Sequence, residues 1–511
     1  MRHSVFSGGL VGLVLWTSPV VADDLWVDHE SLGGPCDDGR GRAEVESATP
    51  WCTLATAALN VEPGDTVHVR GGTYTEVQTC LECDDNSVLE ILQPGTSDDW
   101  IRFVAEADEV VDLRPAGGAE HGIRIRHGAQ PWYVEIVGFR ISGFTSGDCV
   151  GVGDSTDVVL RNLEVTDCTG RGAVELHETA RVTLEASIVH HNDTIGSTSA
   201  VDVWHCGEGN VVRGNLIYDN TDDPPPGSGL EDSEGHGIIM DLCEDGGGAL
   251  IENNVIWGNE GWCITLYRSD HGTVRHNTCW QNGTREGAGE LHVLGNDSLV
   301  HNNILLPRDG RLGLTLRYDQ SSYSVDPTTL QEDANLLWAP THTEVVAWGD
   351  GIRGTVAEYQ AQNPQGWGST TVQADPLLTD PFQLDFTLTD GSPAIDSGDD
   401  DHGAAIDILN APRPWDGDGD DLARVDRGAY EHDSPAGQGG PGGAAGGPPG
   451  PGGSGGAGGT ATGAAPEDEG GCGCRTAAPD GAARWSAATL LWLALVMTIR
   501  RRGRWPAQSK R

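Results

Sequence analysis

The chain has 511 residues, with 31 Lys and Arg against 77 Asp and Glu, a formal net charge of -46 at pH 7. A surface this acidic repels nucleic acid and anionic membranes, so we expect no nucleic-acid partner. It would also repel an acidic polysaccharide unless cations bridged the two, and its simplest role is solubility in a salty exterior. The sole lysine, Lys510, lies in the C-terminal tail.

The first 22 residues have the pattern of a secretory signal peptide. Arg2 and His3 give a short positive end, residues 9–16 are mostly apolar, and a Val-Val-Ala stretch ending at Ala22 is a small-residue cleavage site. We therefore expect export and a mature chain that begins near Asp23.

The cysteines fit an oxidising exterior, because ten of the twelve lie between Cys36 and Cys279. The expected bridges are Cys36–Cys52, Cys149–Cys168, Cys206–Cys243 and Cys263–Cys279. The pair Cys80-x-x-Cys83 favours a tight bridge over a redox motif or a zinc site, since no βαβ context and no second CxxC accompany it.

Residues 23–87 are expected to form an N-terminal cap region. Residues 53–60 (TLATAALN) predict a short amphipathic helix, and residues 63–76 (PGDTVHVRGGTYTE) an alternating strand with a Gly-Gly break. A helix at this place would cover the open end of a solenoid, where unpaired strand edges otherwise invite aggregation.

Residues 88–325 contain a repeat, and one of its registers is occupied by Asn215, Asn254, Asn277 and Asn303. Two of the intervals are 23 and 26 residues, and the 39-residue interval holds a Pro- and acid-rich insertion at residues 221–235. Two short strands in a coil of about 24 residues are too few for a propeller blade and fit an all-β parallel β-helix. A stacked Asn column could hydrogen-bond along the axis of such a solenoid.

The repeat weakens after Asp326, and residues 326–434 predict a closing region. Residues 435–471 are mostly Gly, Pro and Ala and predict a flexible linker. Residues 472–511 hold Cys472 and Cys474, an apolar run at 485–499 and an arginine cluster. We expect this run to form a membrane helix that is short for a full span, with the arginines marking the cytoplasmic side.

Three stretches resemble known families. The coils, through PGDTVHVRGGTYTE and LIENNVIWGNEG, resemble the right-handed parallel β-helix repeats of pectate-lyase-like proteins over residues 63–324. The motifs GSPAIDSGD (391–399) and RGAYEH (427–432) resemble the closing domain of surface β-helix proteins with varied anchors. The tail looks like the C-terminal sorting signal of myxobacterial surface proteins, which implies processing at Cys472 and Cys474 and anchorage at the cell surface.

The first strands of the coils have apolar inward positions, so the residues between and after them should share one outward face. The catalytic candidates on this face are Asp202, Asp241, Glu175 and His177. The candidate substrate contacts are Trp204, Tyr267, Arg268, His292 and Arg317. The insertion at 221–235 should overhang the face and supply Glu231, Asp232 and Glu234. A polar, solvated sheet face without any site is the alternative.

Two mechanisms fit if the face is catalytic. A glycoside hydrolase needs two carboxyl groups: Glu175 and Asp202, about 5 Å apart in one column, would suit a retaining pair, and Asp202 and Asp241, about 7–8 Å apart, an inverting one. Resemblance to polysaccharide lyases implies instead a Lys or Arg base and, in some members, calcium. No lysine lies in the repeat, so Arg268, Arg317, Tyr267 or His177 would have to substitute.

Calcium could also bind the acidic insertion or the sequence DGDGDD at 416–421. Asp416, Asp418 and Asp420 have the first three spacings of an EF-hand loop, but Arg427 stands where the bidentate Glu belongs, so Asp426 is the candidate for the remaining ligand. A plain acidic turn is the alternative.

The sequence thus predicts an exported, surface-anchored monomer that binds and in one version cleaves a polysaccharide. A non-catalytic adhesion or glycan-binding module and a structural coat protein are the alternatives, and all three share the same signal and tail.

Overall fold

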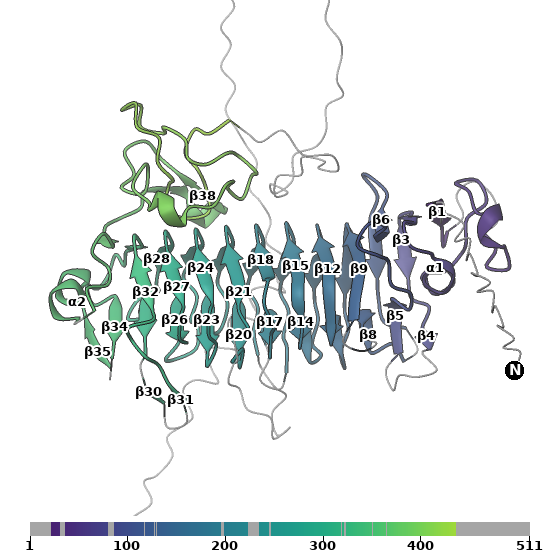
Figure 1. Ribbon diagram of the computed structural model, residues 1–511, viewed down its shortest axis with the longest axis horizontal. Helices are drawn as coiled ribbons and strands as arrows, with labels where there is room; N and C mark the ends of the chain where they lie inside the picture. The colour runs from purple at the N-terminus through teal and green to yellow at the C-terminus, as the bar shows by residue number, and fades with distance from the viewer. Residues whose placement is uncertain are drawn as a thin grey trace, which may run out of the picture. The chain divides into compact units, whose positions relative to one another are not determined.

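The computed structural model describes residues 22–435, except 31–35, 80–85, 117, 127, 129, 196–198, 223–234, 245–246, 318, 321–322, 350 and 364. These residues form a right-handed parallel β-helix, the predicted fold (Figure 1). Residues 1–21 of the predicted signal peptide, residues 436–471 of the predicted linker and the predicted sorting segment with Cys472 and Cys474 lie outside the described residues. So do Cys80, Cys83 and the insertion residues Glu231, Asp232 and Glu234.

Each coil contributes one strand to each of three large sheets, which we call sheets I, II and III and which are parallel except for the antiparallel end strands β4 and β35 of sheet I. One coil runs through β14 (Gly172–His177), β15 (Ala180–Glu185) and β16 (Ile188–His190) before the next begins at β17 (Val201–Trp204). The coil therefore has three strands, not the two expected. The second expected strand is divided at the Asn column, because the residue before each Asn takes a left-handed conformation, as His276 (φ 54°) and Asn302 (φ 59°) do.

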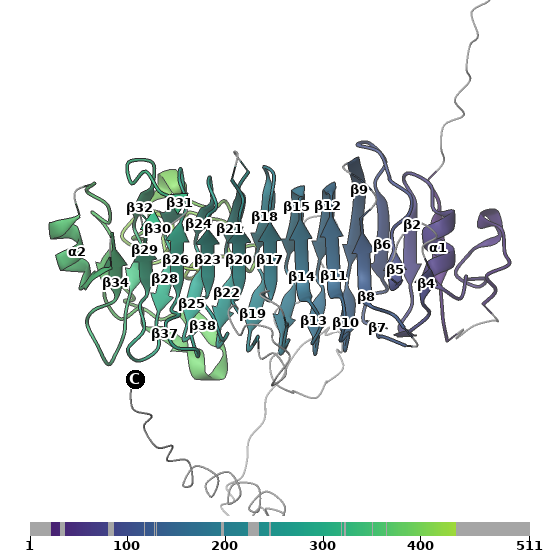
Figure 2. The ribbon, with the colours of Figure 1, turned by 90° about the horizontal axis from the view of Figure 1, so that it is seen from below.

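Sheet I has 12 strands in the described chain: β4 (Gln78–Thr79), β5 (Asn86–Glu90), β8 (His121–Ile125), β11 (Asp148–Gly153), β14, β17, β20 (Ile238–Asp241), β23 (Ile264–Tyr267), β26 (Leu291–Leu294), β29 (Leu314–Leu316), β34 (Val346–Trp348) and β35 (Ile352–Gly354). Figure 2 shows its central strands β14, β17, β20, β23 and β26 side by side. These strands carry the candidate site.

Sheet II has 11 strands in the described residues: β1 (Asp24–Val27), β2 (Thr66–Val69), β6 (Ile101–Ala105), β9 (Gln130–Val137), β12 (Ser155–Arg161), β15, β18 (Asn210–Arg213), β21 (Ala249–Glu252), β24 (Thr273–Arg275), β27 (Leu299–His301) and β32 (Gln331–Asp333). The sheets therefore begin before residue 88, the limit expected from the repeat.

Sheet III also has 11 described strands: β3 (Gly72–Tyr74), β7 (Val111–Leu113), β10 (Phe139–Ser142), β13 (Glu164–Thr166), β16, β19 (Leu216–Tyr218), β22 (Val255–Trp257), β25 (Thr278–Trp280), β28 (Ile304–Leu306), β33 (Leu336–Leu337) and β36 (Val372–Gln373). The strand β36 lies beyond residue 325, so the coils continue into the region expected to close them. The remaining described elements are the strand pairs β30 (Asp319–Gln320) with β31 (Tyr323–Ser324) and β37 (Leu378–Asp380) with β38 (Asp385–Leu388), the helices α1 (Leu54–Asn60) and α2 (Val356–Gln362), and the 3-10 turns η1 (Arg42–Glu44), η2 (Pro381–Gln383) and η3 (Asp400–His402).

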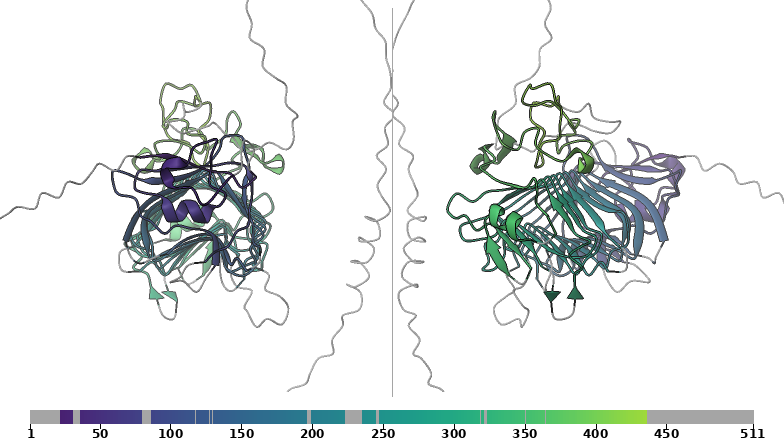
Figure 3. Two further views of the ribbon diagram at one scale, coloured as in Figure 1. Left: turned by 90° about the vertical axis from the view of Figure 1, so that its right-hand side faces the viewer. Right: turned by 60° about the vertical axis from the view of Figure 1, so that its left-hand side comes forward.

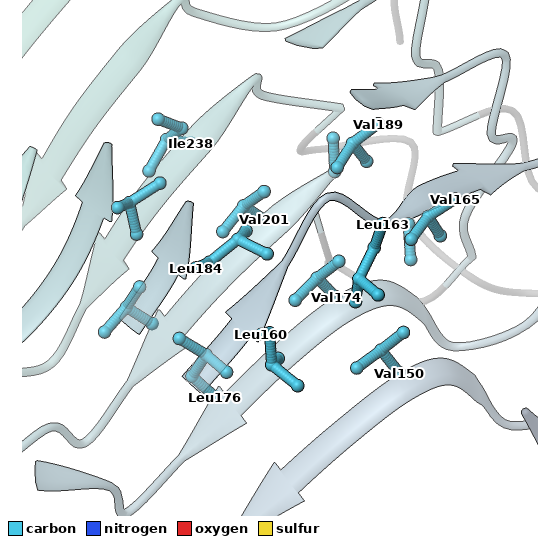
Figure 4. Packing of buried hydrophobic residues seen from close by; sticks show 14 of the residues in the cluster. Val150, Leu160, Leu163, Val165, Val174, Leu176, Leu184, Val189, Val201 and Ile238 are labelled. Carbon is cyan, nitrogen blue, oxygen red and sulfur yellow. The ribbon is translucent and has the colours of Figure 1, made fainter. Parts of the chain in front are cut away.

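The core lies between the three sheets and is built from alternate strand residues. Val174 and Leu176 of β14, Val201 of β17 and Ile238 of β20 are fully buried (Figure 4). Their register is the one expected, since Val174 pairs with Val201 and Val201 with Ile238. Because side chains alternate along a strand, the residues between them must face outward.

Two buried asparagine ladders hold the bends between sheets. The predicted column is confirmed: Nδ2 of Asn215, Asn254 and Asn277 each donates to Oδ1 of the next coil's Asn, at 3.0, 2.9 and 3.0 Å. A second ladder at the bend from sheet III to sheet I contains Asn192, Asn220, Asn259 and Asn282, and ends where Asn282 donates to Glu290 at 2.7 Å. Both ladders satisfy amides that the bends bury.

All four predicted disulfides that fall on described residues are present: Cys36–Cys52, Cys149–Cys168, Cys206–Cys243 and Cys263–Cys279. Cys206 and Cys243 connect successive coils, with Cα atoms 4.9 Å apart. That spacing follows from the distance of roughly 4.8 Å between neighbouring strands.

The N-terminal end is covered by α1, which lies across the coils (Figure 3). Thr53 caps this helix by accepting from the amide of Thr56 at 3.2 Å. Leu54, Ala57 and Ala58 bury its apolar face, so the helical cap is confirmed. No helix among the described residues is long and apolar enough to cross a membrane.

Residues 375–434, which we call the closing region from here on, pack against sheet III and its bends. Arg427 donates to the carbonyl oxygens of Asn335, Thr370 and Ser397. Gly428 has a left-handed φ of 88°, which strains any residue with a Cβ atom, and such an atom would also lie 2.6 Å from Cδ1 of Ile304 and 2.8 Å from Oγ1 of Thr278. The motif RGAYEH therefore docks this region onto the coils.

Candidate functional site

The outward side chains of sheet I stand in two columns. The register aligns Glu175, Asp202, Ile239, Thr265, His292 and Thr315 in the first column, and His177, Trp204, Asp241, Tyr267 and Leu294 in the second. This is the register expected from the sequence. Arg317 follows β29 and is exposed, and Arg268 follows β23 in a left-handed conformation (φ 49°).

The first column is buried, in contrast to a solvated sheet face. Glu175 and Asp202 are each 7% exposed, and His292 is 8% exposed. The second column is only half-buried at His177, Trp204, Asp241 and Tyr267. Side chains from the connections between strands therefore cover the first column.

A cavity of about 270 Å³ lies over β20, β23 and β26. Its lining residues are His236, Ile239, Asp241, Trp262, Thr265, Tyr267, Arg285, Glu286, Gly287, Ala288 and His292. Of the predicted site residues it brings together Asp241, Tyr267 and His292. This volume is slightly below roughly 300–1,000 Å³, the range of drug-sized ligand sites, and leaves room for one small unit.

His292 is the most strongly perturbed group in this cavity. Burial, followed by the charges of Arg317 and His236, lowers its pKa to about 3, so its ring is neutral at physiological pH. Its Nδ1 lies 2.9 Å from the Thr265 hydroxyl, and the Trp262 ring stacks on it with centroids 5.1 Å apart. Its Nε2 has no hydrogen-bond partner in the described part of the chain.

Glu175 belongs to a second, smaller hollow with Arg124, Arg126, Asp148 and His177. Burial, followed by the charge of Asp148, raises the pKa of Glu175 to about 7. Arg171 bridges the two carboxylates, at 3.3 Å from Asp148 and 3.1 Å from Glu175. Glu175 is therefore a carboxyl group that titrates close to neutral pH.

The ion pair between Arg124 and Asp148 lies beside Glu175. It requires a glycine at position 151, which pairs with Glu175 and extends the first column by one coil. Arg124 lies 2.9 Å from Asp148, and a Cβ atom on Gly151 would lie 3.0 Å from the Arg124 guanidinium. The amide of Asp148 lies 2.9 Å from Nδ1 of His121 and donates to it. Asp148 thus has Arg124 and Arg171 as its charged partners at this site.

The other predicted contacts have partners of their own. Trp204 stacks on His177 at 4.3 Å and meets His205 edge-on at 4.6 Å. Burial, followed by Arg126, lowers the pKa of His177. Arg268 pairs with Glu244 at 2.7 Å, away from the cavity lining. The nine predicted residues are therefore distributed over one sheet face and do not line one cavity.

Sequence reasoning missed His236, Trp262 and Arg285. His236 and Trp262 each stand two residues before a sheet I strand, in the matching stretches GHGI and GWCI. This shared register is the sequence signal from which both residues could have been predicted as site residues. Arg285 lies in the connection between β25 and β26 and carried no repeat signal.

The acidic turn gathers a different set of carboxylates from the one predicted. Asp416 and Asp418 lie near Asp396, with one oxygen of each within 4.8 Å of the others. Asp426 instead accepts the amides of Asp396 and His432, and its burial raises its pKa to about 6. Asp420 accepts the amide of Leu422. These acidic groups could bind a metal, through Asp396 in place of Asp420 and Asp426.

Comparison with known proteins defines the class as a right-handed β-helix. Residues 121–305 match the family described as the right handed beta helix region. A search of curated proteins found no match. The chain is similar to the solved structure of pectate lyase Pel9A (13% identity, 81% of this chain and 98% of that one, TM-score 0.44) and to a rhamnogalacturonan lyase (12%, 73% and 96%, 0.47). It is also similar to the A-module of the Azotobacter vinelandii mannuronan C-5 epimerase AlgE4 (15%, 68% and 100%, 0.35).

Proposed function

We propose that this protein binds a polysaccharide along the outward face of sheet I, with one sugar unit in the cavity over β20, β23 and β26. The observation that supports this best is the lining of the cavity. It combines two aromatic rings, Trp262 and Tyr267, with Asp241, His236 and Arg285. Aromatic faces with a few fixed polar groups suit a sugar ring, which has an apolar face and a rim of hydroxyls.

The polar groups have distinct roles in this proposal. The Asp241 carboxylate accepts hydrogen bonds from sugar hydroxyls, and Arg285 donates them. His292, kept neutral by its pKa of about 3, adds no charge to the floor of the cavity. Trp204 lies one coil away and stacks on His177 of the coil beyond, and the pair offers a flat neighbouring surface for the chain.

The charge of the protein favours a neutral glycan over a polyuronate. The net charge of -46 and a carboxylate in the cavity repel an acidic chain. A polyuronate would need bridging cations, and calcium is the cation we propose for that case and for the turn with Asp396, Asp416 and Asp418.

Cleavage is a second candidate, favoured by Glu175. This residue is protonated below about pH 7, and it is paired in register with Asp202 on the next coil. Neighbouring strands are roughly 4.8 Å apart, near the separation of about 5–5.5 Å between the two carboxyls of a retaining glycosidase. Since no lysine lies in the coils, hydrolysis is favoured over elimination. A protein that binds a glycan but does not cleave it would support adhesion without turnover. A protein that binds no glycan would support a structural coat.

Export and anchorage are part of the proposal. They are supported by the apolar start and by the tail at residues 472–511 with Cys472, Cys474 and the arginine cluster. Removing residues 471–511 should release the protein into the medium. Retention of the truncated protein at the surface would contradict anchorage by this segment.

A glycan panel tests the main proposal. The full chain should bind neutral oligosaccharides, and calcium should be required only for acidic ones. Incubation with each bound glycan, followed by assays for new reducing ends and for unsaturated products, separates hydrolysis, elimination and simple binding. Absence of binding to every glycan, with and without calcium, would contradict the function proposed.

A further inference from the structure

A second cluster lies where the last coils meet the closing region, away from sheet I. We propose that His301 of β27 and Asp399 and His402 of the closing region form a binding site for a first-row divalent transition cation, with zinc as the foremost occupant. One ligand atom from each of the three residues lies within 4.8 Å of the other two.

The spacing of the donor atoms suits such an ion. Oδ2 of Asp399 lies 3.2 Å from Nδ1 of His301 and 2.7 Å from Nδ1 of His402. In a tetrahedral zinc site with bonds of about 2.0–2.1 Å, neighbouring donors are about 3.3 Å apart. The two imidazole rings have centroids 4.1 Å apart, so both histidines lie beside the same Asp399 carboxylate.

His301 supplies the independent observation for a ligand. It is only 4% exposed, its Nε2 has no hydrogen-bond partner among the described residues, and its Nδ1 lies 3.2 Å from Oδ2 of Asp399 without forming a hydrogen bond. A buried polar group without a partner costs free energy, so such groups are rare unless a ligand or ion completes them. A cation bound at this place would give one of these two nitrogens a partner.

The residues that precede His301 in its outward column pair with one another. In its outward column on sheet II, charges alternate through Arg161, Glu185, Arg213, Glu252 and Arg275. Arg213 pairs with Glu185 at 2.6 Å, and Arg275 pairs with Glu252 at 2.8 Å. His301 comes next and interrupts this ladder.

Asp333, the next residue of the column, forms its hydrogen bonds elsewhere. Asp333 follows in the same column, but its carboxylate accepts from Ser369 at 2.6 Å and from the amide and hydroxyl of Thr370. His301 is therefore left facing the closing region.

The backbone holds the site in place from both sides. Asn302, next to His301, accepts from the amide of Asp399 at 2.7 Å and donates to the Asp399 carbonyl at 3.0 Å. Oδ1 of Asp399 caps η3 by accepting from Asp401, while Oδ2 faces the two histidines. His402 ends this turn, three residues after Asp399.

The donor set selects the kind of cation. Two imidazole nitrogens and one carboxylate oxygen suit zinc and its neighbours, whereas calcium takes six to eight oxygen ligands. Asp399 and His402 are 31% and 29% exposed, so water can supply a fourth ligand from that side. Since His301 belongs to a coil and the other two residues to the closing region, the ion would join the two parts.

Titration of the EDTA-treated, untagged full chain with Zn²⁺ tests the proposal. One ion should bind with micromolar affinity or tighter and raise Tm, whereas Ca²⁺ at the same concentration should not replace it. His402→Ala should weaken binding by about tenfold or more, because even loss of residues that only orient the ligands costs 10–100-fold. His271→Ala removes an exposed histidine elsewhere and should bind as the wild type does.

Asp399→Asn keeps the size of the side chain and should show the same loss, together with loss of the visible absorption of tetrahedral Co²⁺ seen in the wild type. No Zn²⁺ binding by the wild type, or equal affinity in His402→Ala and Asp399→Asn, would overturn the site. The sheet I cavity takes no part in either measurement.

Discussion

Asn302 and Asp399 hold each other through two reciprocal hydrogen bonds across 97 residues of chain, from the Asp399 amide to Oδ1 at 2.7 Å and from Nδ2 to the Asp399 carbonyl at 3.0 Å. Asn302 also lies 3.1 Å from Nε2 of His276, a buried ring in the preceding coil. One polar side chain thus fixes the closing region to two coils.

Replacing Asn302 with glycine should loosen that attachment. Glycine keeps the left-handed backbone (φ 59°) without strain but removes both bonds, a loss of about 1–3 kcal/mol. Limited proteolysis should cut within residues 375–434 faster than in the wild type. Asn162→Gly, at the equivalent left-handed position (φ 55°) of an earlier coil, is the control and should leave that cleavage unchanged. Equal cleavage in both variants would mean that the other docking bonds suffice.

The asparagine ladder should be more sensitive than any exposed amide. Asn254 accepts from the amide and Nδ2 of Asn215 and donates to Asn277 and to the Val212 carbonyl. Asn254→Ala leaves buried groups without partners, so we expect a loss of about 3 kcal/mol or more and a clear fall in Tm in calorimetry. The exposed Asn60→Ala should change Tm little, and a similar change in both variants would show that the ladder contributes no special stability.

Glu290 should make stability depend on pH. Its burial raises its pKa to about 8, whereas an unfolded Glu titrates near 4.5. Between these values the folded protein holds a proton that the unfolded chain has released. Stability should therefore fall as pH rises through this window, by about 1.4 kcal/mol per pH unit for one such proton. Glu290→Gln should flatten the decline of Tm between pH 6 and pH 8, and an unchanged slope would assign the dependence to other groups.

The sequence predicted the parts of the fold that repeat at one register. Asn215 and Asn254, the buried columns of sheet I and the bridge Cys206–Cys243 all follow from stacking one coil on the next, which depends only on spacing along the chain. The second ladder was equally visible in YDN, WGN and WQN, ending at Asn220, Asn259 and Asn282. The third strand of each coil was missed because a left-handed residue divides what looks like one strand.

The candidate site was only half predictable for a related reason. Asp241, Tyr267 and His292 lie on strands, so their outward direction follows from alternation. Trp262 and Arg285 line the same cavity from the connections, whose paths depend on length and packing that no period describes. The pairing of Glu175 with Arg171 and Asp148 also depends on such a connection, since Arg171 precedes β14.

Calorimetry of glycan binding tests the central claim most directly. It compares the wild type with the variants Asp241→Asn, Tyr267→Phe and Trp262→Ala, using a glycan from the panel. Asp98→Asn, an exposed acid in the N-terminal region, is the control for loss of one charge. We predict that Asp241→Asn and Trp262→Ala weaken binding by about tenfold or more, as loss of a contact of about 1.4 kcal/mol does. Tyr267→Phe, which keeps the ring, should weaken binding less, and Asp98→Asn should not change it. Wild-type affinity in both Asp241→Asn and Trp262→Ala, with unchanged Tm, would contradict a glycan site in this cavity.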